Sequence, residues 1–195
     1  MRLALLRGGV VPMRLAPALL AASVVVWSWA VAPSDLPSPF PYVATSSSGR
    51  FYFKMAPGRD VYGFGAAYAV TASSSQDAEL WSVSGWYSFR VFLSDDGRYL
   101  VSLFSRTSSP RTEASEPADP FVSFYDNGKL LAQYTIAQLI GDPEAILRDP
   151  ERKFVQLSSP PHLDATEAVF RIVTGEQVEY TFDIKTGSIL KKQSL

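Results

Sequence analysis

The chain has 195 residues, of which 47% are hydrophobic and 19% are charged, and it contains no cysteine. This composition supports an apolar core and excludes wholesale disorder, while the missing cysteine excludes disulfides, thiol catalysis and cysteine-ligated metals. The formal net charge of −1 argues against a general nucleic-acid-binding protein, because such proteins carry a basic surplus.

The first feature in chain order is an apolar segment without charge at residues 15–32. Its end, Ala30-Val31-Ala32, fits the small-residue rule for signal-peptide cleavage, so residues 1–32 are expected to direct export and to be removed. The alternative is an uncleaved inner-membrane anchor over residues 15–32, because the segment approaches the roughly 20 residues that span a bilayer. Either Met1 or Met13 could be the start of this signal.

A proline- and serine-rich segment follows at residues 33–49 and predicts an extended spacer. From residue 50 onward, alternation of apolar and polar residues predicts half-buried strands. The predicted domain therefore covers residues 50–195. Its expected strands are 51–55, 66–71, 79–83, 88–94, 99–104, 121–125, 129–134, 154–157, 168–173, 177–182 and 188–191.

Turn residues separate several of these strands. Asp126-Asn127-Gly128 lies between two apolar runs, and Asn-Gly favours a tight hairpin because both residues tolerate positive φ. Asp95-Asp96-Gly97 occupies the same kind of position, and Asp183–Gly187 fits a longer turn with glycine in the left-handed region. The pattern predicts consecutive antiparallel hairpins.

Helix is a minor part of the prediction. Thr135-Ile136-Ala137-Gln138 fits a capping box that opens one helical turn. Asp142-Pro143-Glu144 fits an N-cap followed by a proline at the first helical position. We therefore expect a short helical segment near residues 136–148.

Three of these turns resemble β-propeller repeat units. Residues 94–100 are similar to the opening of blades of the WD40 and TolB types, residues 124–130 to a later blade hairpin, and residues 183–190 to the repeat turn of quinoprotein-type propellers. The Asp-Gly-Arg-Tyr arrangement at residues 96–99 also resembles bacterial exported β proteins. This resemblance implies an all-β fold of blade-like hairpins.

The length limits this fold. A blade takes about 40–50 residues, and a propeller needs roughly four or more blades. Residues 50–195 supply about three, so we expect two or three antiparallel sheets of blade-like hairpins that do not close into a propeller. A β-sandwich is the alternative architecture.

Candidate catalytic residues are few. His162 is the single histidine, it follows two prolines in an expected loop, and one histidine cannot form a histidine-rich metal site. Asp95, Asp96 and Asp126 lie where hairpin turns favour aspartate for its own backbone hydrogen bonds. The sequence therefore predicts no catalytic, cofactor-binding or metal-binding site.

A candidate binding surface consists of an aromatic cluster and two neighbouring acids. Trp81, Trp86 and Tyr87 could stack on a sugar or anchor a protein partner, with Asp95 and Asp96 nearby in the chain. The alternative is that these aromatic side chains belong to the core, as is usual in a small β domain.

These observations favour a non-catalytic exported β domain that binds a partner or supports an envelope assembly. The expected partner is an envelope protein or a glycan and not a nucleic acid, with a membrane tether through the N-terminal segment if that segment is not cleaved. The alternative function is an extracytoplasmic glycan hydrolase that uses paired carboxylates.

Overall fold

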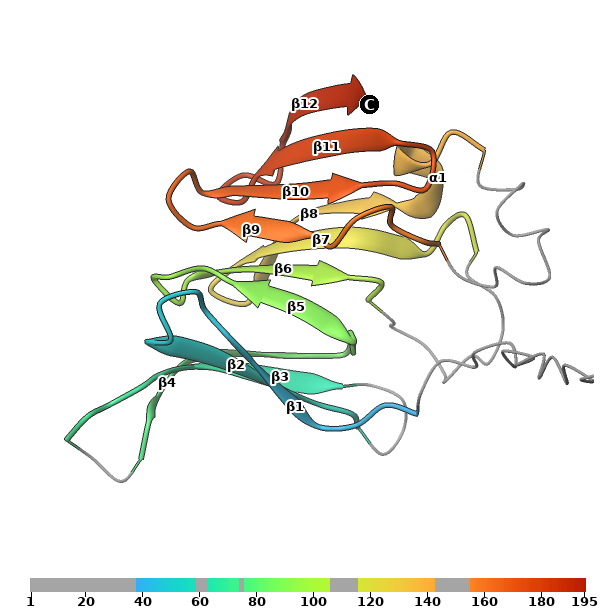
Figure 1. The fold of residues 1–195 in the computed structure, drawn as a ribbon. Helices are drawn as coiled ribbons and strands as arrows, with labels where there is room; N and C mark the ends of the chain where they lie inside the picture. Colours follow the sequence, from blue (N-terminus) through green and yellow to red (C-terminus); the bar gives the residue numbers. More distant parts are fainter. Residues whose placement is uncertain (1–37, 59–62, 74–75, 106–115, 143–154) are drawn as a thin grey trace, which may run out of the picture. The chain divides into compact units, whose positions relative to one another are not determined.

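Three antiparallel sheets of four strands each make up the described part of the computed structural model (Figure 1). The structure describes residues 38–58, 63–73, 76–105, 116–142 and 155–195, all of which belong to the unit Pro33–Leu195. The predicted signal or anchor at residues 1–32 lies outside the described residues, as do residues 143–148 of the expected helical segment.

Each sheet is built from strands that follow one another in the chain, so every connection within a sheet joins neighbours. Sheet 1 contains β1 (Tyr42–Thr45), β2 (Phe51–Ala56), β3 (Phe64–Ala69) and β4 (Ala78–Ser84). Sheet 2 contains β5 (Arg90–Leu93), β6 (Tyr99–Leu103), β7 (Pro120–Asp126) and β8 (Lys129–Thr135). Sheet 3 contains β9 (His162–Asp164), β10 (Val169–Val173), β11 (Val178–Asp183) and β12 (Ile189–Ser194).

The predicted hairpin at Asp126-Asn127-Gly128 is confirmed. Asn127 has a φ of 46° and Gly128 a φ of 78°, and Asp126 pairs with Lys129 across the turn. Positive φ at both central residues is the type I′ geometry, whose twist matches that of the flanking strands. Gly97 and Gly187 also have positive φ, at 69° and 74°.

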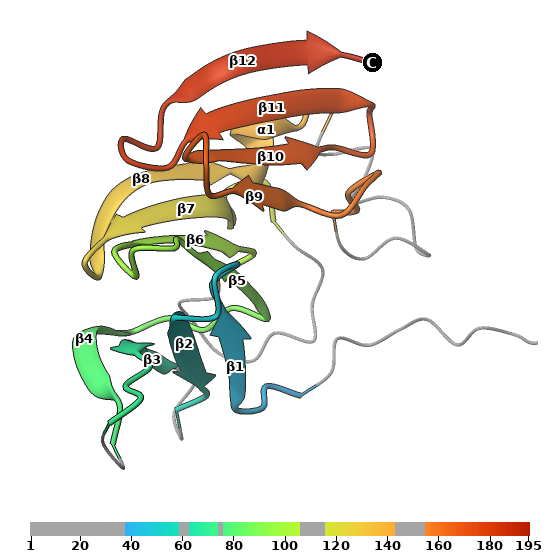
Figure 2. The same ribbon diagram turned by 60° about the vertical axis from the view of Figure 1, so that its left-hand side comes forward.

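Sheet 2 lies between the other two sheets (Figures 1 and 2). One apolar cluster joins sheets 1 and 2, and a second joins sheets 2 and 3. The first contains Phe53, Met55, Ala67, Trp81, Trp86, Tyr87, Val91, Leu93, Leu100 and Tyr125. The second includes Val101, Leu103, Phe121, Val122, Phe124, Phe170, Ile172, Tyr180 and Phe182. Both faces of sheet 2 are therefore core, which explains why every residue of β6 is buried.

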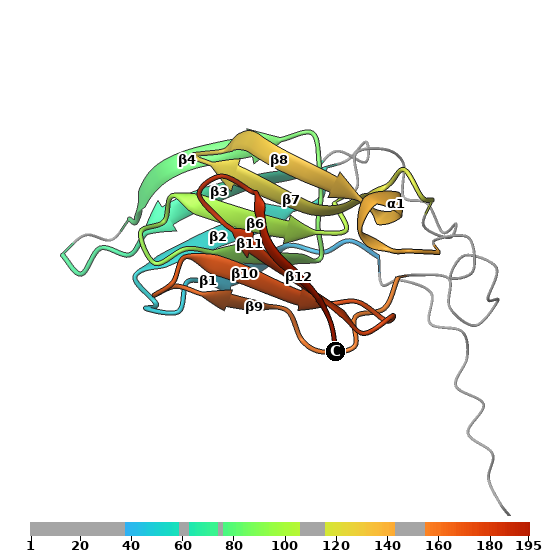
Figure 3. The same cartoon turned by 90° about the horizontal axis from the view of Figure 1, so that it is seen from above.

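The described helix is α1 (Ile136–Leu139), at the end of β8 (Figure 3). The predicted capping residues take part in it, because the Thr135 backbone N–H donates a hydrogen bond to Oε1 of Gln138 at 2.8 Å. Ile136 and Leu139 are buried in the cluster between sheets 2 and 3. The helix therefore packs against this core at the end of sheet 2.

Two strands were not expected from the sequence. β1 (Tyr42–Thr45) lies in the segment assigned to a spacer, where it pairs with β2 over four residues. β9 (His162–Asp164) places His162 in a strand opposite Arg171, where a loop was expected. Both strands follow prolines, and their short length leaves little alternation to detect. Of the expected strand at 154–157, Leu157 forms an isolated bridge to Thr174, and residue 154 lies outside the described residues.

The three four-stranded sheets confirm the predicted fold class, and within the described residues they do not close into a barrel or propeller. In the same part of the chain, no helix is long and apolar enough to cross a membrane.

Candidate functional site

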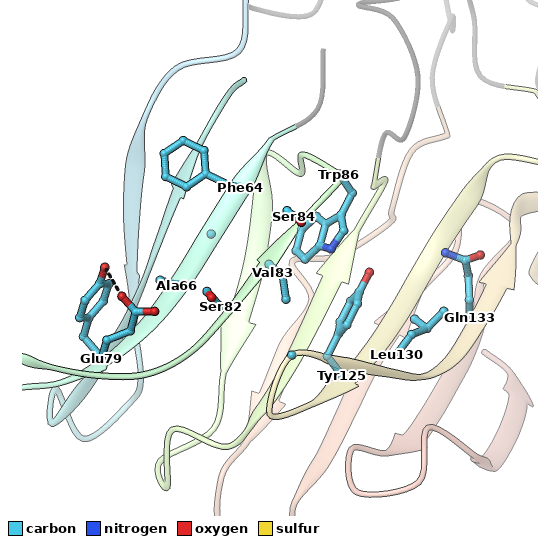
Figure 4. A pocket seen from close by; sticks show the side chains of 13 residues that line it. Phe64, Ala66, Glu79, Ser82, Val83, Ser84, Trp86, Tyr125, Leu130 and Gln133 are labelled. Atoms are coloured by element: carbon cyan, nitrogen blue, oxygen red, sulfur yellow. Dashed lines mark hydrogen bonds between the residues drawn. The ribbon is translucent and has the colours of Figure 1, made fainter. Parts of the chain in front are cut away.

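A hollow of about 860 Å³ lies beside β4, the last strand of sheet 1 (Figure 4). Residues of β3 and β4 line one side, and residues of β7 and the β7–β8 hairpin line the other. Its lining consists of Phe64, Gly65, Ala66, Tyr68, Glu79, Ser82, Val83, Ser84, Trp86, Tyr125, Gly128, Leu130 and Gln133.

The apolar part of this lining includes two side chains that are open to solvent. Phe64 is 54% exposed and Leu130 is also 54% exposed. Because they come from β3 of sheet 1 and β8 of sheet 2, they place apolar surface on both sides of the hollow. Large side chains of this kind at a concave surface are typical of a binding site.

Hydroxyl groups gather beneath the sheet 2 side. Gln133 donates a hydrogen bond from Nε2 to Oγ of Ser123 at 3.0 Å, and the Oγ atoms of Ser102 and Ser105 lie 2.5 Å apart. Burial raises the pKa of the Tyr125 hydroxyl, against the effect of hydrogen bonds with these serines. Burial therefore keeps Tyr125 protonated, and the hydrogen bonds of the serines hold this wall in place.

The sheet 1 side carries negative charge. Glu79 accepts a hydrogen bond from the Tyr68 hydroxyl at 3.4 Å. Asp77, just before β4, accepts one from the Thr71 backbone N–H and one from the Tyr52 hydroxyl, both at 3.0 Å. These bonds hold the pKa of Asp77 below its ordinary value, first through Thr71 and then through Tyr52. Neither carboxylate forms an ion pair with another described residue.

The three aromatic residues of the predicted binding surface are buried. Trp81 is 8% exposed, Trp86 6% and Tyr87 2%. The Trp86 ring is near parallel to the rings of Phe53 and Tyr125, with centroids 6.4 and 5.1 Å away and interplanar angles of 5° and 21°. Because the indole is only 6% exposed, it offers no open face to a sugar. Trp86 borders the hollow as part of the core.

The predicted acids lie in turns and do not line the hollow. Asp95 accepts a hydrogen bond from the Ser48 backbone N–H at 2.7 Å, and this bond lowers its pKa. Asp96 is exposed and accepts hydrogen bonds from the Ser94 hydroxyl and the Arg98 backbone N–H. Asp126 forms a two-point ion pair with Arg98, with both N–O distances at 2.7 Å. The bond from the Arg98 backbone N–H to Asp96 is the local role that turn aspartates usually have, whereas Asp95 and Asp126 join distant segments of the chain.

No group of three metal-binding side chains occurs among the described residues. His162 is exposed on β9, next to the ion pairs that Arg171 forms with Asp164 and Glu167. No serine is hydrogen-bonded to it in the described structure, so a serine–histidine pair is not formed there.

The sequence interpretation missed Phe64, Glu79, Leu130 and Gln133. Each lies in or beside a correctly predicted strand, but the alternation does not say which face a neighbouring sheet covers. A signal was present in β8, where Leu130 and Leu131 are consecutive, so at least one of them had to face away from a single core.

Comparison with known proteins gives no family. No protein-family model matches the chain, and no curated protein matches it. Many solved structures show partial similarity, and two of them serve as examples. A candidate 6-phosphogluconolactonase from Bacteroides fragilis has 15% identity over 80% of this chain, with a TM-score of 0.40. Sqt1 from Saccharomyces cerevisiae has 12% identity over 79% of this chain, with a TM-score of 0.42.

The chain spans about two fifths of those structures, 39% and 38% of their respective lengths. Likeness at this level assigns neither an activity nor a partner to this chain.

Proposed function

We propose that this chain is a non-catalytic, exported binding domain that uses the hollow beside β4 to contact a protein of the cell envelope. The observation that carries this proposal is the composition of the hollow, whose described lining combines the exposed side chains of Phe64 and Leu130 with a single carboxylate, Glu79. Apolar side chains with a few polar groups at a concave surface suit binding.

The same lining counts against glycan hydrolysis. That chemistry needs two carboxyl groups about 5–9.5 Å apart across the bond to be cleaved. Glu79 is the only acid among the described residues that line the hollow, and Asp126 is held by Arg98. The hydrolase alternative therefore has no acid pair to use in this hollow.

Export is part of the proposal on the strength of the sequence. The apolar segment at residues 15–32 and the small residues at its end support a signal peptide, with an inner-membrane anchor as the alternative. Either form would place the sheets outside the cytoplasm. A fusion of the full chain to alkaline phosphatase, which is active only outside the cytoplasm, should be active. An inactive fusion with normal expression would contradict export.

Binding at the hollow can be tested in the native cells by site-specific photo-cross-linking. A photoreactive amino acid replaces Ser82, which lines the hollow, or Gln193 on β12 as the control, since both residues are exposed. We expect irradiation to give a discrete cross-linked protein at position 82 and none at position 193. Equal products at both positions, or none at 82, would contradict the proposal.

Catalysis is tested on purified mature protein with isolated cell-wall glycans. Release of reducing ends should not exceed that of a triple variant, Asp95→Asn, Asp96→Asn and Asp126→Asn. Release by the natural protein that the triple variant lacks would establish the hydrolase alternative instead.

A further inference from the structure

The hollow lies beside an edge strand, β4, whose outer side faces away from β3. β4 is the last strand of sheet 1, so one side of its backbone has no partner strand among the described residues. Side chains alternate along a strand, so Ser82 and Ser84 point to one face of the sheet and Val83 to the other. All three line the hollow. The hollow therefore adjoins the outer edge of β4, where Gly128 of the β7–β8 turn lies against the carbonyl oxygen of Ser82, so a further strand has to move this turn aside at Ser82.

Apolar side chains lie on both sides of the hollow, where the two sets of alternating side chains of an added strand would point. Phe64 pairs with Ser84 across sheet 1 and shares its face, and Leu130 lies on the side of Val83. Both apolar side chains are about half exposed. An extended peptide on β4 would direct alternate side chains toward Phe64 and toward Leu130.

A peptide can use the backbone of β4 along its length, whereas a flat sugar ring finds one exposed aromatic ring, Phe64, among the described lining residues. Of the other lining rings, Tyr68 stacks on Tyr52, with centroids 5.0 Å apart at 17°, and Trp86 is 6% exposed. Backbone hydrogen bonds to β4 need no free aromatic face, so they remain available to a peptide.

The negative charge at the start of β4 favours peptides that carry a basic residue. Glu79 and Asp77 lie at the start of β4, and both lack an ion-pair partner in the described residues. The low pKa of Asp77 keeps that carboxylate ionised at neutral pH. A lysine or arginine at one end of the peptide would meet these charges, whereas an acidic residue there would be repelled.

From these observations we propose that an extended segment of the partner adds to β4 as a fifth strand of sheet 1, with alternating apolar side chains and a basic residue beside Glu79. The inference rests on the proposed binding function and names the chemistry of the partner.

The test uses a phage-displayed library of random dodecapeptides, selected on the immobilised mature protein. We expect the enriched peptides to alternate apolar and polar residues and to carry lysine or arginine near one end. The affinity of one enriched peptide for the protein is then measured by fluorescence polarisation on a synthetic copy. N-methylation of alternate backbone amides on its pairing side should abolish binding, because it removes the donors that join a strand to a sheet edge.

Variants of the protein locate the peptide. Leu130→Ser should weaken binding about tenfold, and Glu79→Gln should weaken it roughly two- to fivefold for the basic peptide. Leu190→Ser on β12 and Glu179→Gln on β11 are matched controls in sheet 3, since Leu190 is 60% exposed against 54% for Leu130. The controls should bind as the natural protein does. Thermal melts verify that all four variants fold.

Three outcomes would overturn the inference: no enriched peptides, enriched peptides whose binding ignores Leu130→Ser and Glu79→Gln, or full binding of the N-methylated peptide. A dimer of the mature protein in sedimentation that Leu130→Ser dissociates would make a second copy the occupant, and would also overturn it. A cross-link at position 82 that persists in any of these cases preserves the binding function, so the two failures can be told apart.

Discussion

Trp81 donates a hydrogen bond from its indole N–H to the carbonyl oxygen of Gly97 at 2.8 Å. The bond joins β4 of sheet 1 to the β5–β6 turn of sheet 2. The next pair of sheets has a similar contact, in which the Tyr134 hydroxyl on β8 donates to the carbonyl of Gly187 in the β11–β12 turn at 2.9 Å. In both cases an aromatic side chain on the last strand of one sheet holds a glycine turn of the following sheet.

Replacing Trp81 tests this contact. Trp81→Phe keeps an aromatic ring but removes the N–H, and we expect a loss of about 1–2 kcal/mol in the free energy of unfolding, from the lost hydrogen bond and the smaller ring. Tyr134→Phe should cost about 1 kcal/mol. Urea denaturation measures both. Tyr68→Phe is the control, because its 3.4 Å bond to Glu79 is exposed; a loss for Trp81→Phe no larger than for this control would contradict the role of the contact.

Gly128 is restricted in two ways, by its backbone and by its surroundings. Its φ is +78°, and an added Cβ would lie 2.8 Å from the carbonyl oxygen of Ser82 in β4. Gly49 has a similar φ of +68° with nothing within 4 Å. Gly49→Ala should therefore cost about 1–2 kcal/mol through backbone strain alone. Gly128→Ala should cost more, because the turn must also move away from β4. Equal losses in urea denaturation would show that the contact with β4 does not restrict this turn.

The sequence predicted the hairpins because their information is local. Asn127-Gly128 and Asp96-Gly97 need positive φ at defined positions, and that requirement can be read from the residues themselves. β1 lacked such a signal, since its pairing with β2 depends on the turn at residues 46–50 and only four residues alternate. The assignment of sheet faces also needed the other sheets. The sequence left a surface position open for Trp81 and Trp86 although such residues usually belong to the core of a small β domain, and in the structure both are buried.

The hollow could not be predicted for the same reason. Phe64 and Leu130 are separated by more than sixty positions in the sequence, and they face one hollow only because sheets 1 and 2 pack together. For the aspartates in the turns, in contrast, the sequence did allow a prediction. Their local role in Asp-Gly turns was expected from the sequence, and the bond from the Arg98 backbone N–H to Asp96 agrees with it. The contacts of Asp95 with Ser48 and of Asp126 with Arg98 join distant parts of the chain and were not predicted.

Acid should act on the ion pair between Arg98 and Asp126. The hydrogen bond from Arg98 holds the pKa of Asp126 below its ordinary value of about 3.9. The pair therefore contributes stability above about pH 4, and this contribution is lost as the pH falls through the lower folded-state pKa. Asp126→Asn should lower the melting temperature slightly at pH 7, and the gap to the natural protein should close near pH 2. A gap that is constant from pH 7 to pH 2 would contradict this role.

The N-terminal segment gives a prediction about processing. If residues 1–32 are a signal peptide, the mature protein should begin between residues 31 and 33, because the small residues there fit the cleavage rule. Intact-mass spectrometry of the exported protein measures its start. A protein in the membrane fraction that still begins at Met1 or Met13 would establish the anchor alternative.

The most direct measurement of the binding account is hydrogen exchange of the mature protein with and without a saturating selected peptide. An added strand would pair the outward amides of β4 (Ala78–Ser84), so the account predicts slower exchange there and unchanged exchange in β12 (Ile189–Ser194), the last strand of sheet 3. Unchanged exchange in β4 with the peptide bound, or protection that appears in β12 instead, would contradict it.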